Sequence, residues 1–237
     1  MNIDRPTLLL DNEKCLNNIK KMQEKATKHR LIFRPHFKTH RSAEISNWFK
    51  SYGVNSCTVS NIEMAEYFAE NNFNDITIAF PANVLQISRI ENLARKINLN
   101  ILIDNLETYE IISKKTNTTL NYFLEIDTGA NRTGVYYSNF ELIKKIVFKE
   151  KNSKKLKLKG LITHAGNTYL CNNANEIEKT HRASIERLIE IKNKLNYEKN
   201  LILSIGDTPS CSISDNFEGI DEIRPGNFVF YDVMQWL

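Results

Sequence analysis

The sequence lacks the marks of a membrane-spanning or exported protein. No apolar run approaches the roughly 18 residues that a membrane-spanning helix needs, and the N-terminus lacks the charged-then-apolar layout of a signal peptide. Cysteine is scarce, and the four that occur show no paired spacing: Cys15, Cys57, Cys171 and Cys211. We therefore expect free thiols in a cytoplasmic protein that has no membrane partner.

The sequence also lacks a concentrated basic patch. The net charge is +4, and the lysines and arginines are spread along the chain. The densest basic run, at 149–159, is typical of a solvated loop between two elements. This distribution predicts no nucleic-acid partner, and no linker or repeat divides the chain. We therefore expect one domain over residues 1–237.

Eight β-branched apolar segments alternate with helical patterns. The predicted strands are 31–37, 55–59, 75–80, 99–103, 121–127, 157–163, 201–205 and 223–231. The predicted helices are 12–29, 42–52, 61–71, 84–97, 106–116, 138–150 and 174–196, with Asp11, Ser60 and Asn105 as start signals for three of them. Such α/β alternation with eight strands predicts a (β/α)8 TIM barrel. A doubly wound open sheet is the alternative, but no Gly-x-Gly-x-x-Gly follows a strand.

The first predicted strand has one polar face. In an extended segment Arg34, His36, Lys38 and His40 point to one side, and Phe33, Pro35 and Phe37 to the other. A lysine among such neighbours has a lowered pKa and a reactive free amine, as a Schiff-base lysine needs. We interpret His36 and His40 as pocket histidines that tune Lys38 or a cofactor. A surface lysine at a strand end is the alternative.

Glycine-rich and polar segments follow the later strands, where a barrel of this type places its active site. Gly206-Asp207-Thr208 follows the seventh strand, before a short helix that Pro209 and Ser210 could open, and Gly226-Asn227 is predicted to lie on the eighth. Small residues let backbone N–H groups approach an anion, so these segments predict a phosphate site. Two ordinary glycine turns are the alternative.

A lysine opposite a phosphate site indicates a phosphorylated aldehyde as ligand. Pyridoxal 5′-phosphate fits that geometry, and so does the substrate of a sugar-phosphate aldolase. Arg132 could meet an oxygen or ring nitrogen of the cofactor, or form a salt bridge with Glu125 or Asp127. Tyr169 could stack on the cofactor or pack at the barrel rim. His164 is a further candidate, although a lone histidine at a strand end is more often structural.

Six segments in order resemble the fold-type III pyridoxal-phosphate enzymes. Within them the chain resembles the D-threonine aldolase and D-serine dehydratase group, which is related to the N-terminal barrel of alanine racemase. The matching segments are Arg5–Asp11, Arg34–His40, Glu125–Gly129 with Arg132–Gly134, His164–Tyr169, Gly206–Ser210 and Glu222–Asn227. No single one of these motifs is decisive, but their order along the whole chain is strong.

The resemblance implies a role for each candidate residue. Lys38 is the Schiff-base lysine, beside His36, and Arg132 and Tyr169 contact the cofactor ring. The phosphate site comprises Thr208, Gly226 and Asn227, with Gly206, Asp207 and Tyr231 nearby. Asp207 departs from the serine that is commoner in the family, which leaves its role open.

The implied activity is that of a lyase on a small β-hydroxy-D-amino acid, by aldol cleavage or by dehydration, in a homodimer. A racemase and a non-catalytic single-barrel carrier of pyridoxal phosphate are the alternatives. However, the phosphate loop that we associate with the carrier family is absent, and Ile205–Pro209 stands in its place.

The chain departs from the family in length. Relatives carry a second, β-rich domain that supplies ligands for a divalent metal, zinc or manganese, and that pairs with an N-terminal strand, here within residues 1–11. The chain closes on the apolar residues 233–237, like one cut short. We therefore expect no metal site in these 237 residues, and weak or no lyase activity from them alone.

Overall fold

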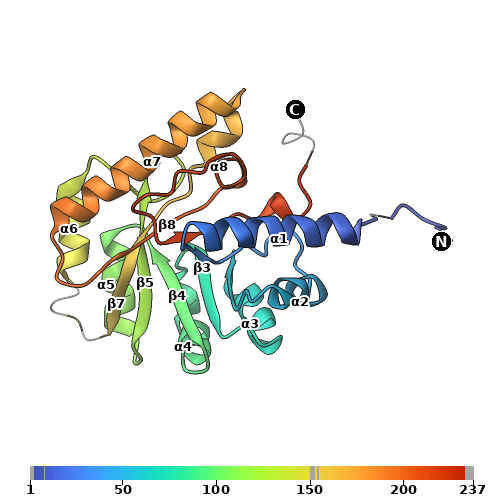
Figure 1. Ribbon diagram of the computed structural model, residues 1–237. Coiled ribbons are helices and arrows are strands. Elements are labelled where there is room, and N and C mark those ends of the chain that lie inside the picture. Colours follow the sequence, from blue (N-terminus) through green and yellow to red (C-terminus); the bar gives the residue numbers. More distant parts are fainter. Residues whose placement is uncertain (1–2, 8, 150–152, 154, 233–237) are drawn as a thin grey trace.

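The computed structural model describes residues 3–7, 9–149, 153 and 155–232 (Figure 1). Its α-helices are α1 (Asn12–Lys28), α2 (Ala43–Ser51), α3 (Ile62–Glu70), α4 (Ile87–Ala94), α5 (Leu106–Lys115), α6 (Phe140–Lys149), α7 (Ala174–Leu195) and α8 (Thr208–Ile213). The 3-10 helices within the described residues are η1 (Val84–Gln86), η3 (Gly166–Leu170) and η4 (Asn227–Val229). The strands are β1 (Ile32–Phe33), β2 (Ser56–Val59), β3 (Asp75–Pro81), β4 (Asn98–Ile103), β5 (Leu120–Asp127), β6 (Val135–Tyr136), β7 (Leu156–Ile162), β8 (Ile202–Ile205) and β9 (Glu222–Ile223).

The strands form the predicted barrel. Within the described residues their order is β1-β9-β8-β7-β5-β4-β3-β2, all pairs are parallel, and β6 lies off this path beside β5. A single bridge between His36 and Thr58 joins the segment after β1 to β2 and closes the circle. The predicted (β/α)8 barrel is therefore confirmed, and the open sheet is wrong.

Helix starts follow the expected chemistry with one correction. Asp11 caps α1 by accepting a hydrogen bond from the Lys14 amide at 3.1 Å, and Asn105 caps α5 in the same way. The predicted start at Ser60 is wrong by one residue, because Asn61 is the residue whose side chain accepts from the Met64 amide, at 2.9 Å. The predicted helix 84–97 divides into η1 and α4, because Asn83 caps a 3-10 turn first.

Two predicted strands are much shorter than expected. The first, 31–37, pairs as a strand at Ile32–Phe33 alone, because Pro35 has no N–H to donate and the chain turns from Phe37 to His40. The eighth, 223–231, is reduced to Glu222–Ile223 in β9 and ends in the 3-10 helix η4. Gly226 and Asn227 therefore lie after the strand and not on it.

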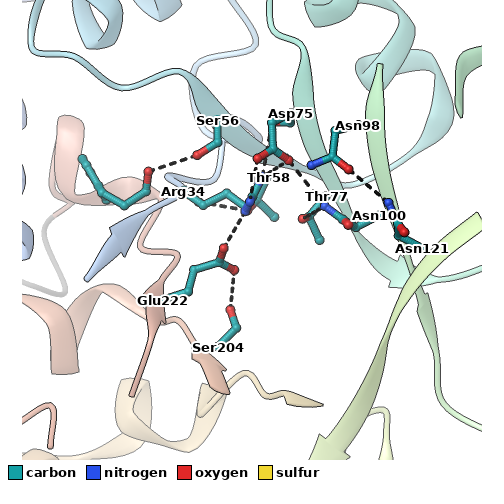
Figure 2. Close-up of polar contacts among 11 residues, drawn as sticks. Arg34, Ser56, Thr58, Asp75, Thr77, Asn98, Asn100, Asn121, Ser204 and Glu222 are labelled. Atoms are coloured by element: carbon teal, nitrogen blue, oxygen red, sulfur yellow. Dashed lines mark hydrogen bonds and ion pairs between the residues drawn. The ribbon is translucent and has the colours of Figure 1, made fainter. Parts of the chain in front are cut away.

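The inner face of the barrel has layers of different polarity. Asp75, Asn98 and Asn100 lie at the N-terminal ends of neighbouring strands, where polar side chains contact one another (Figure 2). Above them a small apolar cluster fills the middle of the barrel: Ala79, Leu102, Phe123, Ile162 and Ile202. The outward-facing side chains join the larger core beneath the helices. Because this cluster fills the middle of the barrel, the space that remains open lies at the carboxyl ends of the strands.

The described parts of the chain ends add little regular structure. Residues 3–7, 9 and 10 are exposed, show no strand, and extend beyond α1 (Figure 1). The expected N-terminal strand is thus not found in these residues, whereas 1–2 and 8, and the apolar end 233–237, lie outside the described residues. The same holds for 150–152 and 154, within the predicted basic loop between α6 and β7. The four cysteines are free thiols. No described helix has the length and hydropathy needed to span a bilayer.

Candidate functional site

A cavity of about 250 Å³ opens at the carboxyl ends of the strands. Its lining is His36, Lys38, Ala79, Leu102, Glu125, Arg132, Ile162, Thr163, His164, Tyr169, Gly206, Asp207, Arg224, Gly226 and Asn227. The fold therefore brings together in one cavity eight of the ten residues that the sequence predicted. The other two, Thr208 and Tyr231, line a neighbouring cavity of about 190 Å³.

Lys38 lies in the turn after β1, with its backbone N–H donating to His36 Nδ1 at 3.3 Å. Burial lowers the pKa of the Lys38 amine, and the positive charges of Arg132 and Arg224 lower it further. Each of these causes favours the unprotonated amine. A neutral amine on the wall of a cavity is able to attack an aldehyde.

The histidines divide between the cavity and the core. His36 and His164 line the cavity, and His164 Nδ1 donates to the Gly206 carbonyl at 2.5 Å. His40 does not belong to the site, contrary to the prediction. The turn interrupts the strand alternation and packs the His40 ring against Phe37, at a centroid distance of 4.6 Å, and against Phe49.

These buried histidines predict a loss of stability in acid. Burial lowers the pKa of His40 and of His164 to about 4, from an ordinary 6.5. Between those values the unfolded chain binds more protons, so the free energy of unfolding should fall as the pH falls from 6.5 toward 4. The expected loss is roughly 1 kcal/mol per pH unit for each histidine. Urea unfolding at several pH values measures it.

A matched variant identifies the source of that pH dependence. His40→Phe keeps a ring among Phe37, Phe49 and Phe68 but removes one titrating group. We expect a shallower decline in this variant below pH 6.5. An unchanged slope would contradict the assignment to His40.

The loops after β8 and β9 interlock around two glycines. A Cβ on Gly206 would lie 2.8 Å from the Arg224 Cβ, and one on Gly226 would lie 3.2 Å from the His36 Cβ. The Gly226 N–H donates to Thr208 Oγ1 at 3.4 Å, and the Thr208 N–H donates to the Tyr169 hydroxyl at 3.2 Å. The small residues therefore allow a close backbone approach beside the cavity.

Asp207, whose role the sequence left open, is the N-cap of α8. Its Oδ1 accepts from the Ser210 N–H at 2.7 Å and from the Thr168 hydroxyl at 2.9 Å. This carboxylate holds the short helix that Pro209 and Ser210 were expected to open, and ties it to η3.

The remaining predicted residues differ in position. Arg132 lines the cavity, and in the described part of the chain it forms no ion pair with Glu125 or Asp127; Thr133 donates to Glu125 Oε1 instead, at 2.8 Å. Tyr231 faces the neighbouring cavity, and its hydroxyl lies 3.0 Å from Ser212 Oγ. It is thus separated from the lining around Lys38.

The sequence missed two charged residues of the cavity. Arg224 is 5 % exposed and donates from Nε to Ser204 Oγ at 2.7 Å and from NH2 to the Thr163 carbonyl at 2.5 Å. Glu125 Oε2 is buried in the wall without a hydrogen-bond partner among the described residues, and burial raises the pKa of this carboxyl. For Arg224 the sequence did carry a signal. In the alternation Glu222-Ile223-Arg224 the side chains of Glu222 and Arg224 point to the same side of the strand, which is the inside of the barrel.

No group of three or more histidine, cysteine, aspartate or glutamate side chains among the described residues could hold a metal ion. The cavity lining does contain an amine (Lys38), the guanidinium groups of Arg132 and Arg224, and Gly206 and Gly226. This arrangement suits a phosphorylated carbonyl compound.

Comparison with known proteins assigns the fold to a family. The profile described as alanine racemase, N-terminal domain, matches residues 10–233. The chain belongs to this family. As a member of the alanine racemase N-terminal domain family, it resembles D-serine dehydratase of Dictyostelium discoideum, with 30% identity over 99% of this chain and 65% of the relative. It also resembles D-threo-3-hydroxyaspartate dehydratase of Delftia sp., with 24% identity over 99% of this chain and 63% of the relative.

Solved structures agree with the family fold. The Delftia dehydratase superposes with a TM-score of 0.90 at 24% identity, covering 99% of this chain and 63% of that one. D-threonine aldolase from Filomicrobium marinum superposes with a TM-score of 0.86 at 18% identity, covering 99% and 64%. The chain spans about two thirds of the length of these relatives.

Proposed function

We propose that this chain is the cofactor-binding barrel of a pyridoxal 5′-phosphate-dependent lyase that acts on a β-hydroxy-D-amino acid. The observation that carries the proposal is the position of Lys38, whose amine has a lowered pKa and shares one cavity with Gly206 and Gly226. The names of the relatives, which include dehydratases and aldolases of D-amino acids, support this class of reaction.

The residues of the cavity fit this cofactor. Lys38 Nζ would hold its aldehyde carbon, and the loops at Gly206 and Gly226 would hold its phosphate, with Thr208 and Asn227 nearby. The unpartnered Glu125 Oε2 and the guanidinium groups of Arg132 and Arg224 leave polar groups open to a ligand. When bound, pyridoxal 5′-phosphate supplies an electron sink for the substrate carbon.

The chain's own residues would then bind and orient the substrate and move its Cα proton. Burial, Arg132 and Arg224 lower the pKa of the Lys38 amine and so favour its neutral form, in which Nζ would accept the proton of the substrate Cα. His164 is fixed by the Gly206 carbonyl, and its lowered pKa keeps the ring uncharged at neutral pH. Tyr169 also lines the cavity.

Two reactions are consistent with this site. Dehydration breaks the Cα–H and Cβ–O bonds and, after water adds, releases a keto acid and ammonia. Aldol cleavage breaks the Cα–Cβ bond and releases glycine and an aldehyde. Because both begin from the same substrate class and use the same lysine, we leave the choice to experiment.

Cofactor titration followed by product analysis tests the proposal. Adding pyridoxal 5′-phosphate to the chain should produce a visible absorbance band that saturates at one cofactor per chain. D-serine, D-threonine and 3-hydroxy-D-aspartate should perturb that band more than their L isomers do. Because we expect weak or no turnover from these 237 residues alone, the products are analysed in a longer form of the protein. Ammonia identifies the dehydratase, glycine the aldolase, and the opposite enantiomer alone a racemase. Absence of the band would overturn the proposal.

Three associated expectations belong to the same proposal. Strongly exposed apolar side chains on the rim, Leu85 at 87% and Leu170 at 81%, support a covering partner, for which we propose a second copy of the chain. Free thiols support a cytoplasmic location. A divalent metal, zinc or manganese, is proposed for a longer form of the protein alone.

A further inference from the structure

A series of polar contacts begins at the half-buried Asp75, crosses the barrel interior through buried side chains and ends at the cavity. Asp75 pairs with Arg34 through two contacts, of 2.7 and 3.1 Å, and Arg34 Nε donates to Glu222 Oε2 at 2.7 Å. Ser204 Oγ lies 2.6 Å from Glu222 Oε1 and 2.7 Å from Arg224 Nε. Figure 2 shows these contacts from Asp75 to Ser204.

The direction of each hydrogen bond in this series is fixed by its chemistry. A guanidinium group donates and never accepts, so the Ser204 oxygen accepts from Arg224 Nε. The single hydroxyl hydrogen of Ser204 is then available to the Glu222 carboxylate, which accepts from Arg34 on its other oxygen. Glu222 therefore determines how the Ser204 hydroxyl points, and Ser204 determines where Arg224 Nε points.

This arrangement leaves one edge of Arg224 open. Its Nε and NH2 are occupied by Ser204 and the Thr163 carbonyl, whereas NH1 has no hydrogen-bond partner among the described residues. The residue lines the cavity and lowers the pKa of Lys38. Burial lowers the pKa of Arg224 itself, and the Glu222 and Glu125 carboxylates oppose that effect.

We infer that Glu222 is a positioning residue, which acts through the Ser204 hydroxyl to hold Arg224 with its NH1 toward the ligand beside Lys38. Neither Glu222 nor Ser204 lines the cavity, so neither is expected to touch the ligand. The inference rests on the proposed function, because the ligand that Arg224 would meet is pyridoxal 5′-phosphate.

The test combines an observation of Arg224 with two affinities. In the chain labelled with ¹⁵N, the side-chain Nε–H signal of Arg224 is assigned by its loss in Arg224→Lys. It should exchange slowly with solvent, and at least about tenfold faster in Ser204→Ala and in Glu222→Gln. In both variants the dissociation constant for pyridoxal 5′-phosphate should rise about tenfold. That for inorganic phosphate, measured by competition, should change little, because the glycine loops are intact.

Glu91→Gln is the matched control for the loss of a buried carboxylate. Glu91 lies on α4 and accepts from the Thr116 hydroxyl at 2.8 Å and the Thr118 N–H at 3.1 Å, away from the cavity. The Glu91→Gln variant should leave the exchange of the Arg224 signal and both dissociation constants unchanged. Backbone amide spectra establish that each variant is folded.

Each outcome decides the inference. It is overturned if the two variants leave the Arg224 signal protected, if they lower both affinities equally, or if they speed exchange without weakening pyridoxal 5′-phosphate. Failure of the unaltered chain to bind pyridoxal 5′-phosphate would overturn the proposed function. Exchange that is slow in the unaltered chain and fast in Ser204→Ala would, even then, support the positioning of Arg224 by Ser204.

Discussion

Lys38→Ala should abolish covalent attachment of pyridoxal 5′-phosphate completely. The lysine is the amine on the wall of the cavity, its pKa is lowered by burial and by Arg132 and Arg224, and alanine has no group that can bind the aldehyde. The visible band that appears when the cofactor is added should be missing. Borohydride reduction followed by peptide mass analysis should place the cofactor on Lys38 in the unaltered chain, and on no peptide of the variant.

Lys25 offers a matched control for this experiment. Burial lowers the pKa of its amine too, but its Nζ donates to the Ser212 and Ser214 carbonyls, both at 2.9 Å, at the end of α8. Lys25→Ala should therefore retain the band and the modified Lys38 peptide. Attachment that persists in Lys38→Ala, or that is lost in Lys25→Ala alone, would refute the role of Lys38.

Arg34→Met should lower the free energy of unfolding by about 3–5 kcal/mol. Burial works against the charge of Arg34, but the Glu222 and Asp75 carboxylates more than offset it and raise its pKa. The Arg34 side chain is 6% exposed and that of Glu222 is 0% exposed. Methionine leaves the Glu222 carboxylate buried without its counter-ion, which costs far more than an exposed pair is worth. Urea unfolding of the cofactor-free chain measures the difference.

Arg89→Met is the surface counterpart. Arg89 also bridges two carboxylates, those of Glu63 and Glu66, each at 2.5 Å, but its side chain is 42% exposed. Water replaces those contacts when the guanidinium is removed, so the unfolding midpoint should move little. Equal losses in the two variants would show that the buried position of Arg34 does not set the cost.

The order of the elements was predictable because each one carries its own local signal. Apolar alternation and capping residues such as Asp11 and Asn105 act within a few residues, so the barrel and seven of its helices follow from the sequence. The lengths of β1 and β9 do not follow from it. These lengths depend on which backbone groups of other segments lie opposite. Pro35 lies opposite Thr58 in the folded chain, and this pairing cannot be read from the sequence.

The site was predictable wherever a motif lies at the end of a strand. Lys38, Arg132 and Tyr169 reach the cavity because parallel strands end at the same side of the barrel. The prediction for His40 was wrong because it continued the alternation of a strand through residues 37–40, which form a turn. Arg224 was missed although the alternation Glu222-Ile223-Arg224 is local, because its contact with Ser204, twenty residues earlier in the chain, forms only after the barrel closes.

The strand order shows that two halves of the barrel contribute different kinds of residue to the cavity. The segments that carry Lys38, the glycine loops, Tyr169 and Arg132 follow β1, β9, β8, β7 and β5, which are consecutive neighbours. The opposite arc, β2 to β4, contributes Ala79 and Leu102 to the cavity lining. The single bridge that closes the barrel, between His36 and Thr58, joins the two arcs outside the span from Lys38 to the glycine loops. If the proposed function holds, substitutions in the loops of the second arc should therefore change the shape of the cavity entrance without removing a residue that we propose to hold the cofactor.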